Sequence, residues 1–114
     1  MTFLPWGGGY NQVAPDATAF PHRNELFLIQ HLLEADPGTA AAHHEPGRRW
    51  LSQSWSLARQ FGSGGAYPNF PDPELPDWGQ AYYGQNYRRL RHVKAAYDPG
   101  NMFRFHQSFP PRQL

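Results

Sequence analysis

The polar groups best suited to binding or catalysis lie in one short segment, Tyr67-Pro68-Asn69-Phe70-Pro71. A tyrosine hydroxyl can donate or accept a hydrogen bond, and an asparagine amide can do both at once. Side chains of these two types, two residues apart, could contact a polar ligand. The same residues could instead form an ordinary Asx turn between two prolines, since asparagine and proline are both common in turns. The residues alone leave both interpretations open.

A second polar candidate, Gln30, ends the apolar run Leu26-Phe27-Leu28-Ile29. An amide in such a run needs hydrogen-bond partners wherever it is buried. Gln30 is therefore predicted either to face a polar pocket or to bond to neighbouring backbone.

The histidines and serines do not form a recognisable catalytic or metal-binding pattern. His43-His44-Glu45 is not accompanied by a paired ligand, and adjacent histidines point apart on most backbones, so no metal site is expected. His22, in a Phe-Pro loop before Arg23, is expected to serve packing or a hydrogen bond. The serines lack a nucleophile-elbow G-x-S-x-G motif, and no paired carboxylates lie in an apolar element, so hydrolase chemistry has no support.

One predicted helix carries a basic face that could bind phosphates. Its cationic candidates are Arg88, Arg89, Arg91, His92 and Lys94. A formal net charge of only +1, with acidic residues scattered along the chain, argues for a solvated face instead. Nucleic acid is therefore not an expected partner, although salt-dependent binding to polyanions would revive that interpretation.

The composition predicts a folded, loop-rich α+β chain of 114 residues, the size of one domain. Eleven glycines and 12 prolines imply short elements and long loops, whereas 18 aromatic residues are unlike a disordered chain. The absence of cysteine excludes a disulfide scaffold and thiolate metal sites. No signal-like start and no apolar run of about 20 residues is present, so we expect no membrane association and a cytoplasmic location by default.

Several elements in the first half of the chain must support the polar segment. Gly7 to Gly9 is predicted to turn the chain into a short strand over Tyr10 to Ala14. Leu26 to Leu33 is predicted to be a strand buried on both faces, because its apolar run is nearly continuous. A loop over Glu34 to Pro46 leads to a helix over Arg48 to Gln60.

The second half is predicted to be mainly helical. Ala66 to Phe70 is expected to be extended between prolines, and Asp77 to cap a short helix through Tyr82. The last helix is predicted over Gln85 to Tyr97, with Asp98-Pro99-Gly100-Asn101 as its stop. So few strands leave sheet edges uncovered, so we expect another chain or domain to pack there and the isolated chain to self-associate.

Three motifs between Tyr67 and Phe103 follow an order that helical periodicity does not require. They are the Y-x-N-[FY]-x-D element from Tyr67, the Y-Y-G-x-N element from Tyr82, and the D-P-x-N-x-F element from Asp98. Together with Trp6-Gly7-Gly8-Gly9 and the run through Gln30, they resemble the C-terminal part of the berberine bridge enzyme-like family of FAD-linked oxidoreductases. The resemblance covers roughly residues 3 to 111.

The resemblance implies a fold and a cofactor. Residues 1–62 would be part of an antiparallel-sheet substrate domain, and residues 63–114 would be the C-terminal BBE segment that packs on an FAD-binding domain. Tyr67 and Asn69 would lie beside the flavin, with Gln30 and Phe70 toward a small-molecule substrate. FAD would bind only together with a flavin-binding domain that this sequence does not contain.

The catalytic base is the point at which this sequence departs from the family. Many members use a tyrosine at the fourth position of Y-x-N-[FY], where this chain has Phe70, which has no proton to exchange. Tyr67 is the remaining candidate, although a tyrosine hydroxyl ordinarily ionises only near pH 10.

Two hypotheses follow from the resemblance. The chain could be a component of a flavin oxidase that acts on an alcohol, sugar or secondary metabolite by hydride transfer to FAD, completed by a possible separate FAD-domain chain and not competent alone. Alternatively, it could be a non-catalytic remnant or interaction module that lacks the flavin domain.

Overall fold

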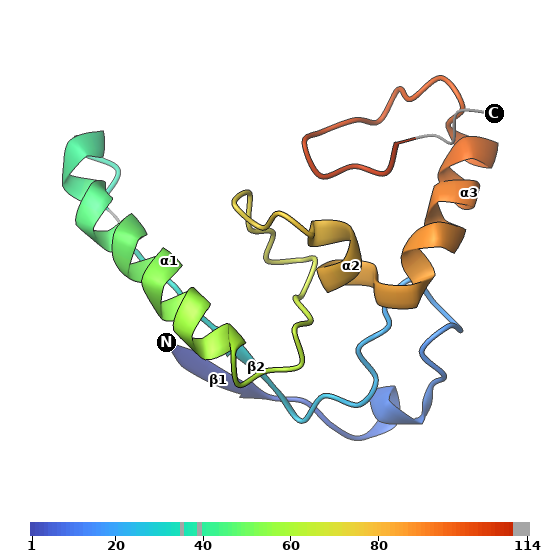
Figure 1. Ribbon diagram of the computed structural model, residues 1–114, viewed down its shortest axis with the longest axis horizontal. Coiled ribbons are helices and arrows are strands. Elements are labelled where there is room, and N and C mark those ends of the chain that lie inside the picture. The colour runs from blue at the N-terminus through green and yellow to red at the C-terminus, as the bar shows by residue number, and fades with distance from the viewer. Residues whose placement is uncertain (35, 39, 111–114) are drawn as a thin grey trace. The chain divides into compact units, whose positions relative to one another are not determined.

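The computed structural model describes residues 1–34, 36–38 and 40–110. Two strands, β1 (Thr2–Pro5) and β2 (Phe27–Gln30), form an antiparallel pair. The α-helices are α1 (Glu45–Arg59), α2 (Trp78–Tyr83) and α3 (Tyr87–Tyr97) (Figure 1). A small antiparallel sheet combined with helices confirms the predicted α+β class.

The backbone divides into two compact units. The first contains residues 1–7 and 25–64, and the second contains residues 8–24 and 65–114. Each unit therefore combines segments that are distant in the sequence. The assignment of residues 1–62 and 63–114 to two domains of the family remains a prediction.

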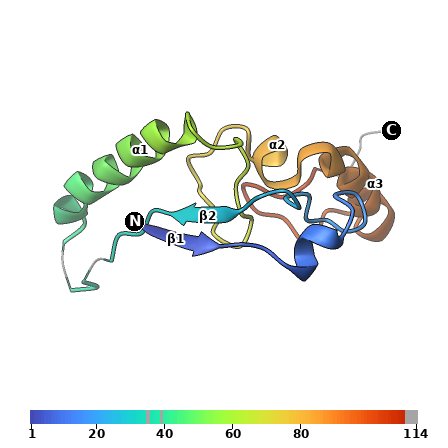
Figure 2. The same cartoon turned by 90° about the horizontal axis from the view of Figure 1, so that it is seen from below.

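The first unit consists of the sheet and α1. In the sheet, Thr2 pairs with Gln30 and Pro5 pairs with Phe27. Figure 2 shows α1 along one side of the sheet. The hydroxyl of Ser54 on α1 lies 2.9 Å from Nδ1 of His31, immediately after β2. Among the residues of this unit whose exposure is described, none is fully buried.

Among the residues whose exposure is described, the buried ones all lie in the second unit. Leu75, Ala81 and Tyr82 are the buried hydrophobic residues, and Asn86 and Gln107 are buried polar residues. Four of the five lie on or beside α2 and the turn that follows it, so this short helix is the centre of the unit.

Close packing joins α2 to α3 within this unit. A Cβ added to Gly79 would lie 2.6 Å from the Tyr87 ring, so only glycine permits this approach. The Phe109 ring packs on Tyr83, with ring centroids 4.8 Å apart, and on Tyr87 at 5.4 Å. Aromatic rings thus supply much of the unit's packing.

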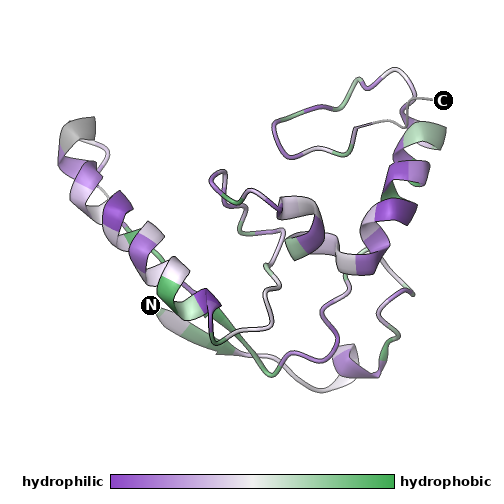
Figure 3. Ribbon diagram, in the orientation of Figure 1, coloured by the Kyte–Doolittle hydropathy of each residue, from purple (hydrophilic) through white to green (hydrophobic). Residues whose placement is uncertain are grey.

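The predicted helices are confirmed with small shifts of their ends. α1 begins three residues before the predicted Arg48, and the helix predicted from Gln85 begins with a 3-10 turn over Gly84–Asn86 that leads into α3. Asp77 does precede α2, but its side chain makes no capping hydrogen bond. Hydrophilic residues cover much of α1 and α3 (Figure 3).

The predictions for the strands and loops were less accurate. The segment predicted as a strand over Tyr10 to Ala14 instead begins as a 3-10 helix, Gly9–Gln12, after Gly8 adopts a φ of 88°. The loop predicted over Glu34 to Pro46 includes a 3-10 helix, Ala41–His44, and the start of α1. β1 was not predicted.

The strand predicted over Leu26 to Leu33 is shorter and more exposed than expected. Pairing is limited to Phe27–Gln30, and Phe27 is 50% exposed. The expectation that this strand is buried on both faces was wrong. Among the described residues, β2 pairs only with β1, and no second sheet covers it.

Candidate flavin-contact turn

The segment Tyr67 to Phe70 forms a tight turn. The backbone N–H of Phe70 donates a hydrogen bond to the carbonyl of Tyr67, at 3.0 Å. Pro68 occupies the second position, where its fixed φ suits a β-turn. The prediction of an extended segment from Ala66 to Phe70 was therefore wrong at its C-terminal end. The hydrogen-bonded turn does not exclude a ligand contact, because the turn positions the side chains that would make this contact.

Two polar side chains of the turn contact each other. The Asn69 amide donates a hydrogen bond from Nδ2 to the Tyr67 hydroxyl at 2.9 Å. Asn69 is exposed, whereas Tyr67 is half-buried. The turn therefore presents a phenol and an amide as one pair at the surface of its unit.

Aromatic rings support the Tyr67 side chain. The ring packs edge-on against Phe20, with centroids 5.9 Å apart, and against Phe70 at 5.5 Å. Phe20 in turn lies under the Arg23 guanidinium, 5.0 Å from its centroid, and against His22 at 5.3 Å. His22 thus makes a packing contact, one of the two roles that were predicted for it.

Hydrogen bonds attach both sides of the turn to α2. Before the turn, the N–H of Ala66 donates to the carbonyl of Ala81 at 2.8 Å. After it, the N–H of Asp72 donates to the Tyr82 hydroxyl at 2.8 Å. Because Ala81 and Tyr82 are 4% and 3% exposed, the turn is anchored to the best-packed part of the unit.

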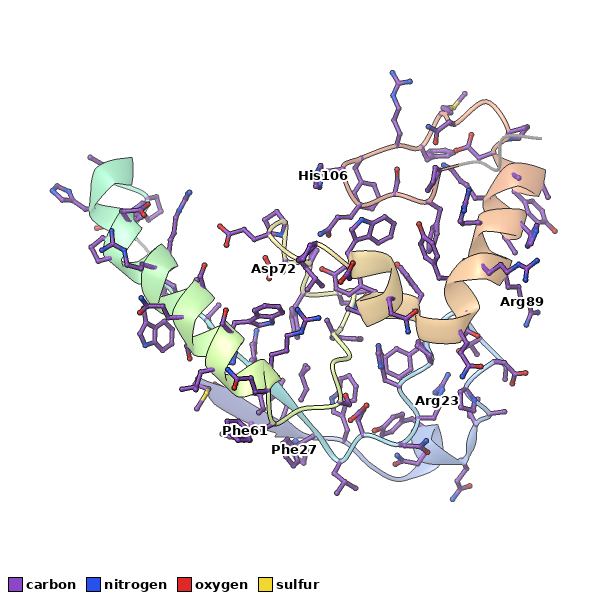
Figure 4. All side chains as sticks on the ribbon, in the orientation of Figure 1. Arg23, Phe27, Phe61, Asp72, Arg89 and His106 are labelled. Atoms are coloured by element: carbon purple, nitrogen blue, oxygen red, sulfur yellow. The ribbon has the colours of Figure 1, made fainter. Side chains whose placement is uncertain are left out.

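A buried amide completes the anchorage at Asp72. The Tyr82 hydroxyl donates to Oε1 of Gln107 at 3.4 Å, and Nε2 of Gln107 donates to the Asp72 carbonyl at 2.6 Å. Asp72, labelled in Figure 4, lies in the loop before α2. The sequence alone indicates no role for these three residues, although all three lie in the part of the chain that resembles the family.

Asn86 connects the turn region to the N-terminal segment of the same unit. Its amide donates to the carbonyls of Pro15, at 2.7 Å, and Thr18, at 3.0 Å. Arg89 donates to the carbonyl of Asp16 at 3.0 Å. At least one arginine of the basic face thus binds protein backbone.

Gln30 lies in the first unit, at the end of β2, and is half-buried. The structure therefore brings Tyr67, Asn69 and Phe70 together but does not place Gln30 with them. Phe70 is 50% exposed, so it offers an accessible apolar surface beside the polar pair.

The loop after α3 is fixed by a carboxylate. Asp98 accepts hydrogen bonds from Lys94 and from the N–H groups of Met102, at 2.8 Å, and Phe103, at 3.0 Å. The bond from Lys94, with help from the two N–H groups, lowers the pKa of the Asp98 carboxyl below its usual value, although desolvation opposes this effect. Within the described residues, no three His, Cys, Asp or Glu side chains cluster as a metal site would require.

Comparison with curated proteins identifies the class. The chain is 41% identical over 106 residues to the uncharacterized FAD-linked oxidoreductase YgaK of Bacillus subtilis (strain 168). The aligned residues cover 92% of this chain and 22% of that protein. It is 35% identical over 126 residues to berberine bridge enzyme-like 1 of Arabidopsis thaliana, covering 96% and 23% of the two chains. It is 36% identical over 115 residues to the chitooligosaccharide oxidase of Gibberella zeae, covering 93% and 23%. FAD-linked oxidoreductases are thus the class of protein that this chain resembles.

The family follows from the segment that contains the turn. The family model described as "Berberine and berberine like" matches residues 66–110. Residues 66–110 thus match the C-terminal BBE segment of the berberine bridge enzyme-like family, and the rest of the chain is similar to FAD-linked oxidoreductases of that kind. It spans less than a quarter of the length of the three relatives. No solved structure matches the chain.

The described residues fit the flavin ring of FAD better than its diphosphate. An exposed amide beside a supported phenol can hydrogen-bond to a polar edge of a flavin ring. Gly7 to Gly9, by contrast, leads into a four-residue 3-10 helix, which is too short to offer a phosphate the N-terminus of a helix. The donor set therefore suits the flavin ring, and the diphosphate would have to be held by other residues.

None of the helices in the described part of the chain combines the length and apolarity needed to cross a membrane.

Proposed function

We propose that this chain is the C-terminal component of a berberine bridge enzyme-like oxidase that acts on an alcohol, sugar or secondary metabolite. The observation that carries the proposal is the anchored turn at Tyr67–Phe70, which exposes an amide inside the segment matched by the family model. A flavin domain, in the same polypeptide or in a separate chain, completes the enzyme.

FAD, when bound, supplies the acceptor for a hydride from the carbon that carries the substrate's hydroxyl group. The residues of this chain orient the reactants and receive the proton. Asn69 is proposed to bind a polar edge of the flavin ring, while its bond to Tyr67 holds the phenol next to that edge. Oxidation to a carbonyl also releases the hydroxyl proton, so a base is required.

Tyr67 is the proposed base, because Phe70 cannot accept a proton. Phe70 is instead proposed to form an apolar wall toward the substrate, consistent with its exposed ring. Gln30 is proposed to face the substrate from the end of β2, as the resemblance implies. The substrate itself is a small molecule whose hydroxyl can approach the turn.

Reconstitution tests this proposal. The YgaK relative would be truncated before its matching segment, mixed with FAD and this chain, and followed by flavin fluorescence and by flavin reduction with a panel of alcohols and sugars. Asn69→Ala is expected to change the flavin spectrum and slow reduction. Asn24→Ala is the matched control, because Asn24 is also an exposed asparagine of the same unit.

The alternative function, a non-catalytic remnant or interaction module, is supported by the phenylalanine at position 70. It predicts that the chain binds the flavin domain without any reduction of the flavin.

Equal spectra and rates for Asn69→Ala and Asn24→Ala would contradict the proposed flavin contact.

A further inference from the structure

The turn that carries Tyr67 and Asn69 depends on a residue more than thirty positions away in the sequence. Gln107 donates to the Asp72 carbonyl at 2.6 Å and accepts from the Tyr82 hydroxyl at 3.4 Å. The same hydroxyl accepts from the Asp72 N–H at 2.8 Å. The donor and the acceptor of one backbone residue are thus both bonded by side chains from outside the turn.

Because these hydrogen bonds are buried, they favour one backbone geometry at Asp72. Tyr82 is 3% exposed and Gln107 is 7% exposed, so neither polar group has ready access to water as a substitute partner. Leaving such groups unpaired is costly, and the arrangement that pairs all of them is therefore strongly favoured. Since Asp72 follows the turn by two residues, fixing its backbone also fixes where the turn ends.

The anchorage is two-sided, which distinguishes it from ordinary core packing. Ala66, just before the turn, bonds to the Ala81 carbonyl at 2.8 Å, and Asp72, just after it, bonds to Tyr82. Ala81 and Tyr82 are consecutive residues of α2. The few residues between these two anchors include the complete Tyr67–Asn69 pair.

We infer that Tyr82 and Gln107 are positioning residues, which hold the Tyr67–Phe70 turn in the geometry that presents Tyr67 and Asn69 to the flavin and substrate. This inference deepens the proposed function and rests on it for the catalytic consequence. Tyr82 and Gln107 themselves contact neither substrate nor cofactor. They act through the backbone of Asp72.

The informative variant is Tyr82→Phe, which removes the bridging hydroxyl but keeps the ring that packs on Tyr83 at 6.1 Å. Tyr83→Phe is the matched control: it lies next along α2 and is half-buried, and its hydroxyl takes no part in this anchorage. Gln107→Met is the second variant, since it keeps the side-chain length while removing both hydrogen bonds. If Tyr82→Phe does not fold, Gln107→Met still tests whether the turn is held in place.

The first readout needs no flavin. Hydrogen exchange at the Phe70 amide, which closes the turn, is measured in the full chain. We expect exchange to become about fivefold faster or more in Tyr82→Phe and Gln107→Met, and to be unchanged in Tyr83→Phe. Equal exchange rates in the three variants would overturn the positioning role.

The second readout uses the reconstituted complex. We expect kcat for flavin reduction to fall about tenfold to a hundredfold in Tyr82→Phe, with KM, the affinity for the flavin domain and the flavin content unchanged. A purely structural role would instead lower the amount of folded complex and leave kcat per bound flavin intact, and that result would overturn the inference.

The two arms separate the two proposals. A wild-type complex without any flavin reduction would refute the proposed function, while the exchange comparison would still decide whether Tyr82 and Gln107 hold the turn. Faster exchange together with a normal kcat would show that the turn's geometry has no catalytic consequence and would refute the inference alone.

Discussion

Position 70 carries a phenylalanine where the resemblance implies a tyrosine base in many berberine bridge enzyme-like proteins. Phe70 packs on Tyr67 at 5.5 Å and is half exposed, so a hydroxyl at the tip of its ring has room within this unit. Tyr67 already accepts a hydrogen bond from Asn69. The turn can therefore accommodate a second phenol without a change of fold.

We predict that Phe70→Tyr raises the rate of flavin reduction in the reconstituted complex about tenfold or more, because it adds a general base beside the substrate. The comparison is with wild type and with Phe105→Tyr, an equivalent change at another exposed phenylalanine. A rate that equals that of wild type would show that Phe70 does not face the reacting hydroxyl.

Asp98 gives a pH-dependent contribution to stability. Hydrogen bonds from Lys94 and from the Met102 and Phe103 N–H groups favour its charged form and lower its pKa in the folded chain. A lowered pKa stabilises the fold fully above the usual pKa of an aspartate, about 4, and the effect is lost as the pH falls through the lower folded value.

We predict that Asp98→Asn lowers the melting temperature at neutral pH and that the difference from wild type shrinks as the pH falls below about 4. Thermal unfolding followed by circular dichroism at several pH values measures this. Asp36→Asn, at an exposed aspartate elsewhere, is the control. A difference from wild type that is constant across this pH range would contradict the lowered pKa of Asp98.

Among the secondary-structure elements, α2 and the 3-10 turn after it organise the second unit. Asn86, 6% exposed, donates to two backbone carbonyls of the segment that precedes Phe20. That segment supplies Phe20, the ring against which Tyr67 packs. Asn86 therefore stabilises the candidate site indirectly, because it holds the segment that carries Phe20.

We predict that Asn86→Ala costs about 1–3 kcal/mol of unfolding free energy, because it leaves the carbonyls of Pro15 and Thr18 without this donor. Gln85→Ala, at the exposed neighbouring position, is expected to cost much less. Urea denaturation of the two variants measures the difference. Equal costs would show that the buried amide is not needed.

Elements with a strong local pattern could be predicted from the sequence. α1 and α3 were predicted because apolar residues recur at helical spacing and because Asp98-Pro99-Gly100 ends α3. β1 was missed because a four-residue strand that ends in proline has little local signal and is defined by pairing with residues 22 to 28 positions away.

The candidate site was only partly predictable. The residue types of the turn made Tyr67 and Asn69 candidates, and the resemblance supplied their proposed roles. The turn was judged extended because proline restricts the residue before it, although Pro68 itself also suits a turn. The bonds from Tyr82 and Gln107 to Asp72 could not be predicted, since contacts between residues 10 and 35 positions apart leave no periodic trace.

At the level of the whole chain, apolar surface is the main feature. Exposed large side chains occur in both units, including Phe27 at 50%, Phe61 at 85% and Phe103 at 75%. β1 and β2 each have an edge that pairs with no other described strand. Such surfaces and edges favour association with another chain or domain.

We predict that the chain alone self-associates, and that Phe27→Lys reduces the association because a charge on an edge strand opposes pairing. Asn24→Lys, which adds the same charge outside the sheet, is the control. Sedimentation velocity measures the oligomer fraction. A compact wild-type monomer with a cooperative melting transition would contradict the prediction.

The most direct test of the account is a titration of the purified chain with FAD, followed by flavin fluorescence, in the presence and absence of the truncated YgaK relative. We predict that the chain alone gives no tight binding, and that the two proteins together bind FAD and reduce it with a suitable alcohol or sugar. No flavin response from the pair, under conditions in which intact YgaK retains its flavin, would contradict the claim that this chain completes a flavin oxidase.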